Sequence, residues 1–432
     1  MNICVIGTGY VGLVTGTCLA EFGMNIICVD KDSSKIAMLS DGRVPFYEPG
    51  LDDLVQKNAA QGRLRFSTEV KEGVQSSLVI FIAVGTPSKK DGTVDLGYVE
   101  EAAHEIAEYM NGYKVIAVKS TVPVGTCQRI KAIIRKKRPR GFNFDVVSNP
   151  EFQREGAAIE DFTHPDRITI GAESEQAVAI MRDIYSALYL NEIPFVITNL
   201  ETAEMIKYAA NAFLATKITF VNEIATLCES VGADVQVLTR AMGLDGRIGR
   251  KFLHPGPGYG GSCFPKDTVA LLHIGRESGC ELRVVDSVIK ANEEQRLRMV
   301  EKIRKMVGEL RGKTIGILGL SFKPNTSDVR ESSSIIIARK LQEEGAKIRA
   351  YDPAAMDEAK AILRDVEYCS DPYEVAEGCD VLVLITEWNQ FRRLDLDRLK
   401  KSMKTPIFVD LRNVYEPGKM EKAGFRYCGV GR

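Results

Sequence analysis

The sequence predicts an α/β fold: two Rossmann-like, doubly wound domains joined by a long central helix and a helical dimerisation region. A strand, a glycine turn, a helix and a second strand open the chain at residues 2–30, and this pattern returns in outline at residues 313–352. Between them, residues 201–231 carry apolar side chains at three- and four-residue spacing, which indicates a helix about 45 Å long. We expect domains at residues 1–200, 201–305 and 306–432.

Composition and charge narrow the class of protein. With 432 residues, 45% of them hydrophobic, the chain can bury the cores of two or three domains. The 57 Lys and Arg residues balance 58 Asp and Glu, so the net charge does not indicate nucleic acid or an anionic membrane. The ten cysteines lack the spacing of a zinc site, so we expect reduced thiols and no metal. The chain begins directly with a strand and has no membrane-length apolar run, which favours a cytoplasmic protein.

One local charge cluster departs from this balance. The basic run at residues 135–140 is the single candidate for a polyanion site. Because a proline interrupts it, we interpret it instead as the solvated end of a helix.

The first turn carries the fingerprint of a dinucleotide site. Residues 7–12 read GTGYVG, follow a strand at residues 2–6 and precede a helix, and a second strand ends at Asp30. The glycines let a pyrophosphate approach the helix N-terminus, and a carboxylate at Asp30 suits the ribose hydroxyls of NAD better than the 2′-phosphate of NADP. A lone motif of this kind is weak evidence, but the flanking strand, helix and acid make it strong. Lys35 lies close enough to temper the preference for NAD.

Three further strands end in polar or turn residues. We expect these strands at residues 78–84, 115–118 and 144–147. Open α/β sheets bind ligands at the carboxyl ends of their strands, where this chain places Thr121, Glu151 and Glu155. Ordinary turn chemistry explains each glycine or proline nearby, but it explains less well why Thr121, Glu151 and Glu155 all fall at the same edge.

A glycine-rich segment at residues 252–267 surrounds Cys263 and indicates a nucleophile. Pro265 suits the first turn of a helix, whose N-terminal amides would favour the thiolate of Cys263. The alternative is a buried structural cysteine beside a turn, which is the commoner role of a cysteine.

Two polar pairs stand out in the remaining chain. Lys207 and Asn211 lie four residues apart on the long helix and therefore share one face, as a catalytic pair or simply as a surface pair. In the second Rossmann-like domain the third glycine of the fingerprint is missing, and Lys323 and Arg330 are present instead. A nucleotide there would be held by cationic side chains more than by a bare helix end.

The chain resembles the UDP-glucose 6-dehydrogenases, within the UDP-glucose/GDP-mannose dehydrogenase family, over essentially its whole length. The resemblance rests on the motifs GTGYVG, VGTP, KSTVPVGT, SNPEFQREG, DGRIGRKFL, GYGGSCFPKD and SFKPNTSDVRESSS, together with the Lys207 and Asn211 helix. It implies oxidation of the primary alcohol of UDP-glucose to UDP-glucuronate by two hydride transfers to NAD, through a thiohemiacetal and a thioester of Cys263. The same reaction on a UDP-N-acetylhexosamine or on GDP-mannose is the alternative within the family.

The resemblance also implies roles for individual residues. Cys263 is the nucleophile, Lys207 stabilises oxyanion charge, Asp267 with Thr121 places a water, Glu151 is the acid or base of hydrolysis, and Asn211 steadies the reacting oxygens. The implied NAD-binding residues are Gly7, Gly9, Tyr10, Val11, Gly12, Asp30, Lys35, Gly85, Thr86, Pro87, Thr121, Glu155, Lys266 and Arg330. The implied UDP-sugar-binding residues are Glu151, Phe152, Gln153, Arg154, Glu155, Lys207, Asn211, Arg247, Phe252, Leu253, Tyr259, Gly260, Lys323 and Arg412. Arg247 matches a position that reaches a neighbouring subunit, which implies at least a homodimer, although such a residue on a loop is ordinarily solvated.

Two functions of other classes remain open. A two-electron hydroxyacid dehydrogenase of the 6-phosphogluconate type shares the first domain and the Lys and Asn helix, but it needs neither Cys263 nor residues 311–432. A catalytically silent NAD sensor or scaffold would show broken catalytic positions, and here each expected position is filled.

Overall fold

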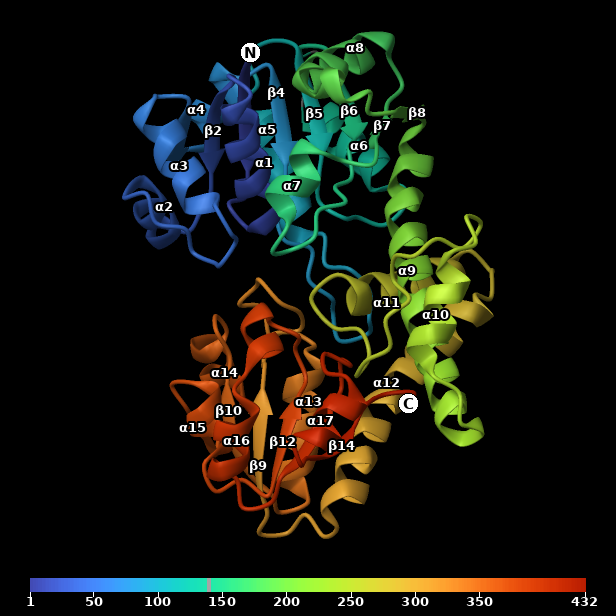
Figure 1. Ribbon diagram of the computed structural model, residues 1–432. Coiled ribbons are helices and arrows are strands. Elements are labelled where there is room, and N and C mark those ends of the chain that lie inside the picture. Colours follow the sequence, from blue (N-terminus) through green and yellow to red (C-terminus); the bar gives the residue numbers. More distant parts are fainter. Residues whose placement is uncertain (138–140) are drawn as a thin grey trace. The chain divides into compact units, whose positions relative to one another are not determined.

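The computed structural model describes residues 1–137 and 141–432, which form two compact units. Unit 1 comprises Met1–Ala210 with His273–Ser278, and unit 2 comprises Asn211–Leu272 with Gly279–Arg432. Each unit is built around a parallel or mostly parallel sheet, and Figure 1 labels their elements in chain order. The expected α/β class, with two Rossmann-like sheets and a long central helix, is confirmed.

Unit 1 contains an eight-stranded sheet of order β3-β2-β1-β4-β5-β6-β7-β8. Its first six strands run parallel, β7 pairs antiparallel with β6, and β8 is parallel to β7. The strands are β1 (Asn2–Ile6), β2 (Asn25–Val29), β3 (Leu64–Ser67), β4 (Val79–Ile82), β5 (Lys114–Val118), β6 (Phe144–Ser148), β7 (Ile168–Gly171) and β8 (Phe195–Thr198).

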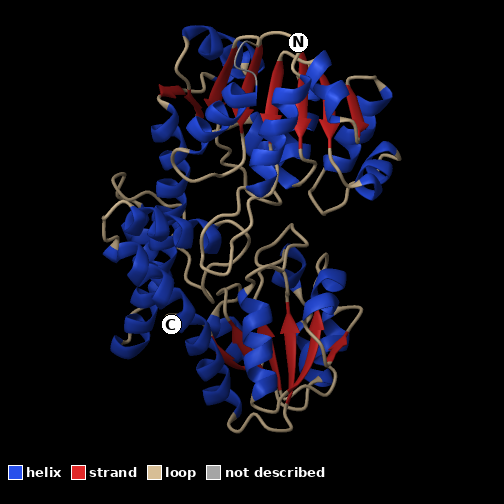
Figure 2. Ribbon diagram, turned by 180° about the vertical axis from the view of Figure 1, so that it is seen from behind, coloured by secondary structure: helices blue, strands red, loops and turns tan. Residues whose placement is uncertain are grey.

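Helices cover both faces of this sheet, as Figure 2 shows. Alternation along β1 explains why: Ile3 and Val5 belong to one hydrophobic cluster, and Cys4 and Ile6 to the cluster on the opposite face. The first cluster includes side chains of α1, α3, α7 and α8, and the second includes side chains of α4, α5 and α6. The helices are α1 (Tyr10–Glu21), α2 (Ser33–Ser40), α3 (Leu51–Ala60), α4 (Val70–Ser76), α5 (Gly97–Tyr109), α6 (Thr126–Lys137), α7 (Ala158–Thr163) and α8 (Glu175–Ile184), with the 3-10 turn η1 (Ser186–Asn191).

The long central helix, α9, spans Leu200–Val231 and confirms the helical spacing of the sequence. Residues up to Ala210 belong to unit 1 and the remainder to unit 2. Its second half shares one hydrophobic core with the sheet of unit 2, through Val221 and Ala225. Three helices follow it in the chain: α10 (Val235–Gly243), α11 (Phe264–Glu277) and α12 (Arg283–Val307).

The sheet of unit 2 has six parallel strands in the order β11-β10-β9-β12-β13-β14. The strands are β9 (Thr314–Leu318), β10 (Lys347–Tyr351), β11 (Val366–Tyr368), β12 (Val381–Leu384), β13 (Ile407–Asp410) and β14 (Arg426–Cys428). The helices are α13 (Ser333–Glu343), α14 (Met356–Ile362), α15 (Pro372–Ala376), α16 (Leu396–Ser402) and α17 (Pro417–Lys422), with the 3-10 turn η2 (Asn389–Arg393). Two hydrophobic clusters, one on each face, form the core.

Two expectations are refined by the structure. The strand expected at residues 78–84 is shorter: β4 covers only Val79–Ile82, and Leu78, just before it, is 37% exposed. The basic run is a helix end as expected where it is described: α6 ends at Lys137, residues 135–137 are exposed, and residues 138–140 lie outside the described residues. Among the described residues, no helix combines the length and apolar character needed to cross a membrane.

Candidate active site

The turn after β1 is shaped by glycines and leaves the start of α1 open. Gly7 has a φ of +101°, and a Cβ there would lie 2.6 Å from the Ala83 carbonyl oxygen. A Cβ at Gly12 would overlap the Gly7 carbonyl oxygen, whereas the Cβ position of Gly9 meets nothing within 4 Å. Gly9 is the N-cap of α1 and offers no side-chain cap, so the first amides of the helix remain available to an anion.

Asp30 directly follows β2, beside this turn, as expected for a ribose-binding acid. Its carboxylate accepts hydrogen bonds from the Thr8 amide and hydroxyl, each at 2.8 Å, and from the Asp32 amide at 3.1 Å. The Lys35 ammonium is 3.9 Å away. Burial alone would raise the pKa of Asp30, but the bonds from Thr8 and Asp32, with the charge of Lys35, lower it below its usual value. The carboxylate is therefore ionised at neutral pH, as an acceptor for ribose hydroxyls must be.

The exits of β4, β5 and β6 lie together at one edge of the sheet. The strands pair in register at their carboxyl ends, Ile82 with Val118 and Val118 with Ser148. The segments that follow are also joined, because Thr86 Oγ1 donates to the Thr121 carbonyl at 3.0 Å. Within unit 1 the segments that follow β4 and β5 therefore meet at this edge, and the segment with Glu151 and Glu155 leaves the neighbouring strand β6 at the same edge.

Glu151 and Lys207 form a buried ion pair. Glu151 Oε1 lies 2.9 Å from Lys207 Nζ, and both side chains are only 5% exposed. The other carboxylate oxygen of Glu151 accepts the Gln153 amide, and the Lys207 ammonium also lies 5.4 Å from the centroid of the Phe152 ring. Removing one partner of such a pair leaves an uncompensated buried charge, so each side chain fixes the other. Of the remaining expected residues in this segment, Arg154 is exposed and bonds Asp161.

Sequence reasoning missed a second buried cation beside this pair. Lys119 follows β5 and is 5% exposed, and its ammonium donates to Asn149 Oδ1 at 3.2 Å and to the Tyr185 hydroxyl at 3.1 Å. Lys119 and Asn149 stand within the KST and SNPEF segments, but nothing in the spacing of those segments relates either one to Tyr185.

Two buried acids that were also missed hold the loops of unit 1. Glu204 accepts the amides of Gly125 at 2.6 Å and Cys127 at 2.7 Å, at the start of α6. Burial raises the pKa of Glu204, although these amides oppose the shift. Glu48 accepts the amides of Gly156 at 2.5 Å and Ala158 at 2.8 Å, at the start of α7. These carboxylates fix the segments that follow Thr121 and Glu155.

In unit 2, Cys263 immediately precedes α11. Its carbonyl accepts the Asp267 amide at 2.8 Å, as the first bond of the helix, and its Sγ lies 3.7 Å from Ser262 Oγ. The helix begins at Phe264, so Pro265 occupies its first turn as the sequence predicted. The side chain of Cys263 is partly exposed, whereas most other cysteines of the chain are buried. Cys263 is therefore only partly buried and lies at the N-terminus of a 14-residue helix, a position that favours a thiolate.

Asn211 and Asp267, both predicted to be catalytic, are hydrogen bonded. Asn211 Nδ2 donates to Asp267 Oδ2 at 2.7 Å, and Asp267 is 1% exposed. The other oxygen of Asp267 lies 2.6 Å from Lys266 Nζ. Lys266, expected to bind the cofactor, thus neutralises a buried acid one turn from Cys263.

The glycines before Cys263 are required by close neighbours. A Cβ at Gly258 would lie 2.8 Å from Asn292 Oδ1, and one at Gly261 would lie 2.7 Å from the Phe322 ring. A Cβ at Gly260 would overlap the Glu331 carbonyl oxygen. At these three positions the backbone packs directly on other parts of unit 2, so a side chain could be added only if those neighbouring atoms moved.

Polar side chains of α12 hold the backbone of this loop, and the sequence analysis did not identify them. Asn292 accepts the Tyr259 amide at 2.8 Å and donates to the Tyr259 carbonyl at 3.1 Å. Gln295 donates to the Gly256 carbonyl at 2.8 Å, and Arg296 donates to the Tyr259 carbonyl at 3.1 Å. The sequence feature that could have identified them is their spacing, because Asn292, Gln295 and Arg296 lie three and four residues apart and so share one face of the helix.

The cationic residues expected at the UDP-sugar site adjoin the same loop. Arg412 donates to the Ile385 carbonyl at 2.9 Å, and a Cβ at Gly256 would lie 2.9 Å from its guanidinium. Lys323 Nζ lies 5.3 Å from the centroid of the Phe322 ring, the same ring that packs on Gly261. The glycine loop, Lys323 and Arg412 are thus gathered within unit 2.

The other expected residues of unit 2 differ in exposure. Leu253 and Tyr259 are buried, and Phe252 has a φ of +64°. Arg247 is 90% exposed and bonds Asp245, and Arg330 is 64% exposed and bonds Asp328. Neither arginine points into the core of its unit.

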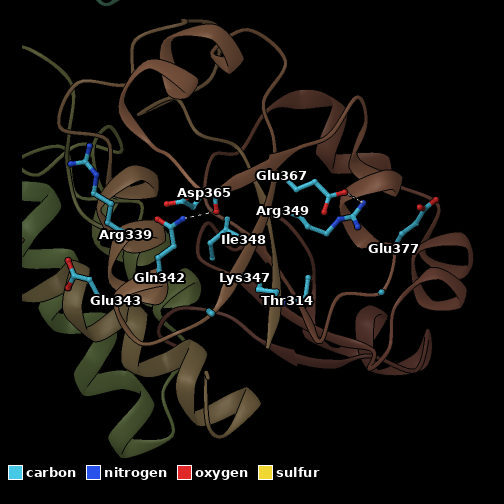
Figure 3. Close-up of a pocket in the computed structure, with 12 residues that line it drawn as sticks. Thr314, Arg339, Gln342, Glu343, Lys347, Ile348, Arg349, Asp365, Glu367 and Glu377 are labelled. Atoms are coloured by element: carbon cyan, nitrogen blue, oxygen red, sulfur yellow. Dashed lines mark hydrogen bonds and ion pairs between the residues drawn. The ribbon is translucent and has the colours of Figure 1, made fainter. Parts of the chain in front are cut away.

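A cavity of about 850 Å³ lies elsewhere in unit 2, at the amino ends of β9 and β10. Figure 3 shows its lining, where Arg349 pairs with Glu367 and Gln342 bonds the Asp365 carbonyl. Parallel sheets bind ligands at the carboxyl ends of their strands, and the charges here are mixed and largely neutralise one another. We assign no ligand to this cavity.

Comparisons with known proteins agree with this geometry. Models of the UDP-glucose/GDP-mannose dehydrogenase family match residues 1–189 (NAD binding domain), 201–294 (central domain) and 316–417 (UDP binding domain). The chain is 52% identical to the UDP-glucose 6-dehydrogenase of Rhizobium meliloti (strain 1021), with both chains covered in full. It is 49% identical to the UDP-glucose 6-dehydrogenase TuaD of Bacillus subtilis (strain 168), covering 100% of this chain and 93% of that one.

A solved structure is similar over the whole chain. The UDP-glucose dehydrogenase of the hyperthermophilic archaeon Pyrobaculum islandicum shares 39% of its sequence, covers 100% of this chain and 97% of its own, and superposes with a TM-score of 0.93. Together with the NAD turn, the partly exposed Cys263 and the three family models, this shows that the chain belongs to the UDP-glucose/GDP-mannose dehydrogenase family.

Proposed function

We propose that this protein oxidises UDP-glucose to UDP-glucuronate with two molecules of NAD and one water, in the cytoplasm. The observation that carries the proposal is the partly exposed Cys263 at the start of α11, with the Asn211–Asp267 hydrogen bond one turn further along that helix. An aldehyde cannot give up a second hydride until a nucleophile has added to it, and a thiolate is suited to that addition. The curated relatives named above carry this activity in their names.

The chemistry divides between the cofactor and the chain. The turn at residues 7–12 and the Asp30 carboxylate would hold NAD, which would supply the hydride acceptor for each oxidation. Between the oxidations, the Cys263 sulfur forms a bond to the C6 aldehyde carbon, giving a thiohemiacetal, which the second oxidation converts to a thioester. Water then adds to the thioester carbonyl, the carbon–sulfur bond breaks, and the acid and the thiol are released.

We assign the remaining roles from charge and burial. The Lys207 ammonium stabilises negative charge on the reacting oxygen, and Glu151, held by Lys207 at 2.9 Å, is the acid or base of thioester hydrolysis. Asp267, with Thr121, places the water, and Asn211 orients the reacting oxygens through its bond to Asp267. In this proposal residues 1–200 bind NAD, residues 201–305 supply Cys263 and the dimer interface, and residues 306–432 bind the UDP moiety.

The ratio of products tests the proposal. UDP-glucose and NAD should yield two NADH per uronate, whereas a two-electron hydroxyacid dehydrogenase would yield one per product. Cys263→Ser should keep its affinity for NAD and form no uronate, and Cys280→Ser, which changes an exposed thiol, should behave as wild type. Normal uronate production by Cys263→Ser would refute the covalent step. UDP-N-acetylmannosamine and GDP-mannose in the same assay identify the preferred sugar.

We also propose that the protein is a homodimer or a higher homo-oligomer through α9. Phe213, Phe220 and Leu227 are 66%, 47% and 55% exposed and lie seven residues apart, so they form one apolar stripe on the helix. An exposed apolar stripe, unlike scattered exposed apolar residues, is typical of a surface that contacts another protein. Phe220→Asp should shift the mass measured by light scattering toward that of a monomer. A wild-type mass of one chain at micromolar concentration would contradict the proposal.

A further inference from the structure

Lys119 occupies a position that burial makes costly. Its side chain is buried at the carboxyl end of β5, and the two hydrogen-bond partners of its ammonium, Asn149 Oδ1 and the Tyr185 hydroxyl, are both neutral. Tyr185 also donates to Asn149 Oδ1 at 2.6 Å, and Asn149 Nδ2 donates to the Thr169 carbonyl at 2.8 Å. An ammonium removed from water without a carboxylate in direct contact lowers stability, so its retention calls for a role.

This network adjoins Glu151. Asn149 is separated from Glu151 by one residue, and a cavity of about 40 Å³ is lined by Lys119, Glu151 and Tyr185. The charged groups Asp161 and Arg167 also line that cavity. A volume of this size accommodates about one water molecule.

The charges of this region are coupled. Burial lowers the pKa of Lys119 to about 8; the Glu151 carboxylate opposes that shift, and the positive charge of Lys207 adds to it. Arg167, whose guanidinium lies 3.7 Å from the Phe152 ring centroid, has a pKa that burial lowers, and Asp161 is occupied by Arg154. When these groups are charged, two ammonium groups, those of Lys119 and Lys207, act on the single carboxylate of Glu151.

We propose that Lys119 is a positioning residue for Glu151. With Asn149 and Tyr185 it fixes the segment that carries the Glu151 side chain, and its positive charge favours the ionised carboxylate that activates water during thioester hydrolysis. This inference rests on the proposed function, in which Glu151 serves the release of the acid.

Another buried lysine, at the opposite end of β5, provides a matched control. Lys114, the first residue of β5, is equally buried at 5% exposure, and its ammonium donates to the Ser77 carbonyl at 2.5 Å. Lys119 lies five residues further along the chain, about 16.5 Å away at 3.3 Å per residue. A general effect of losing a buried ammonium should appear in Lys114→Met as well as in Lys119→Met.

The experiment follows the thioester itself. Enzyme is mixed with UDP-glucose and NAD, quenched at intervals between pH 5 and pH 9, and the covalent adduct is measured by intact-protein mass spectrometry. In Lys119→Met and Lys119→Gln we expect adduct to accumulate because hydrolysis slows at least tenfold at pH 7. The acidic limb of the hydrolysis rate should move up by half a pH unit or more, since a nearby positive charge has been removed. The hydrolysis rate of Lys119→Arg should stay within threefold of the wild-type rate. The pH profile of Lys114→Met should coincide with that of the wild type.

Each outcome decides the matter. A wild-type pH profile without adduct in the neutral variants overturns the inference, as does an equal loss in Lys114→Met or in the arginine variant. If neither neutral variant folds, Tyr185→Phe decides: hydrolysis at least threefold slower with unchanged KM for NAD supports the inference, and an unchanged rate overturns it. If wild type yields one NADH per product and Glu151→Gln forms no adduct, the proposed function fails instead.

Discussion

The sheet of unit 2 has the topology of the first six strands of unit 1, but the two differ at the turn where a dinucleotide would bind. Strands β3-β2-β1-β4-β5-β6 and β11-β10-β9-β12-β13-β14 follow one order, and both first strands end in a glycine of positive φ, Gly7 and Gly319. An acid follows the second strand in each unit, Asp30 and Asp352. At the level of strands and turns the second sheet repeats the first.

The helix that follows each turn begins differently. In unit 1, α1 begins three residues after Gly7, and its N-cap Gly9 leaves the first amides uncapped. In unit 2, α13 begins at Ser333, and its N-cap Ser332 accepts the Ser334 amide with its own hydroxyl. The helix end that is left open in the first sheet is therefore occupied by a side chain in the second.

The two acids differ in the same sense. Asp352 is 1% exposed and accepts six hydrogen bonds, two of them from the Ser321 amide and hydroxyl and one from Trp388 Nε1 at 3.1 Å. Asp30 accepts three and its side chain is 16% exposed. Protein groups thus saturate the second acid, while the first retains capacity for ribose hydroxyls. A repeated fold therefore need not bind the same ligand, because the side chains that occupy the turn determine whether a ligand can bind there.

The largest effect should come from the glycine that both turns share. A Cβ at Gly7 would lie 2.6 Å from the Ala83 carbonyl oxygen, and one at Gly319 would overlap Thr386. We expect Gly7→Ala and Gly319→Ala each to lower the free energy of unfolding by about 3 kcal/mol, through positive φ and overlap together. Hydrogen exchange resolved by strand should show each loss in its own unit. Gly62→Ala, at positive φ but with no atom near the added Cβ, should lower the free energy of unfolding by only about 1 kcal/mol. If Gly62→Ala cost as much as Gly7→Ala, steric overlap would not explain the larger loss.

Exchanging each acid for its amide should separate folding from cofactor binding. Asp352→Asn places N–H donors against N–H donors, so we expect a loss of about 2 kcal/mol in the free energy of unfolding, with the NAD affinity unchanged. Asp30→Asn should cost less stability, because Asp30 accepts fewer hydrogen bonds, and should weaken NAD about tenfold relative to NADP. Chemical denaturation and fluorescence titration measure the two effects. A weaker NAD affinity in Asp352→Asn would mean that the second turn also binds the cofactor.

The open position in the first turn makes a sharper and smaller test. The Cβ of an alanine at Gly9 meets no protein atom within 4 Å, and the φ of −72° is allowed for any residue. We expect Gly9→Ala to leave the free energy of unfolding within about 0.5 kcal/mol of wild type while NAD binds about tenfold more weakly, or about 1.4 kcal/mol. Gly112→Ala, equally open but remote from the turn, should change neither quantity. Undiminished affinity in Gly9→Ala would remove Gly9 from the cofactor site.

The fold was largely predictable because its signals are local. The strands at residues 2–6 and 25–29 and the helix α9 follow from apolar periodicity and from glycines at strand ends. The Asn211–Asp267 bond also agrees with residues named from the motifs.

The supports of the site could not be predicted, because they join segments far apart in the sequence. Lys119 meets Tyr185 across 66 residues, and Glu204 meets Gly125 across 79. Burial rather than residue type distinguishes such side chains from solvated ones, and a single sequence does not show burial. The hydrogen bond from Trp388 to Asp352 in the second turn is another example, since the two residues lie 36 positions apart in the sequence.

The smallest effect that separates the two turns is a dependence of stability on pH. The hydrogen bonds from Thr8 and Asp32 hold the pKa of Asp30 below its usual value, against the effect of burial. An acid with a lowered folded-state pKa stabilises the fold at pH above its unfolded value near 3.8, and this contribution disappears as the pH falls through the folded pKa. The difference in melting temperature between wild type and Asp30→Asn should therefore be constant from pH 7 to pH 5 and should shrink toward pH 3. A difference that widens on acidification would mean that the carboxylate is held in its protonated form, and a protonated Asp30 could not distinguish NAD from NADP by charge.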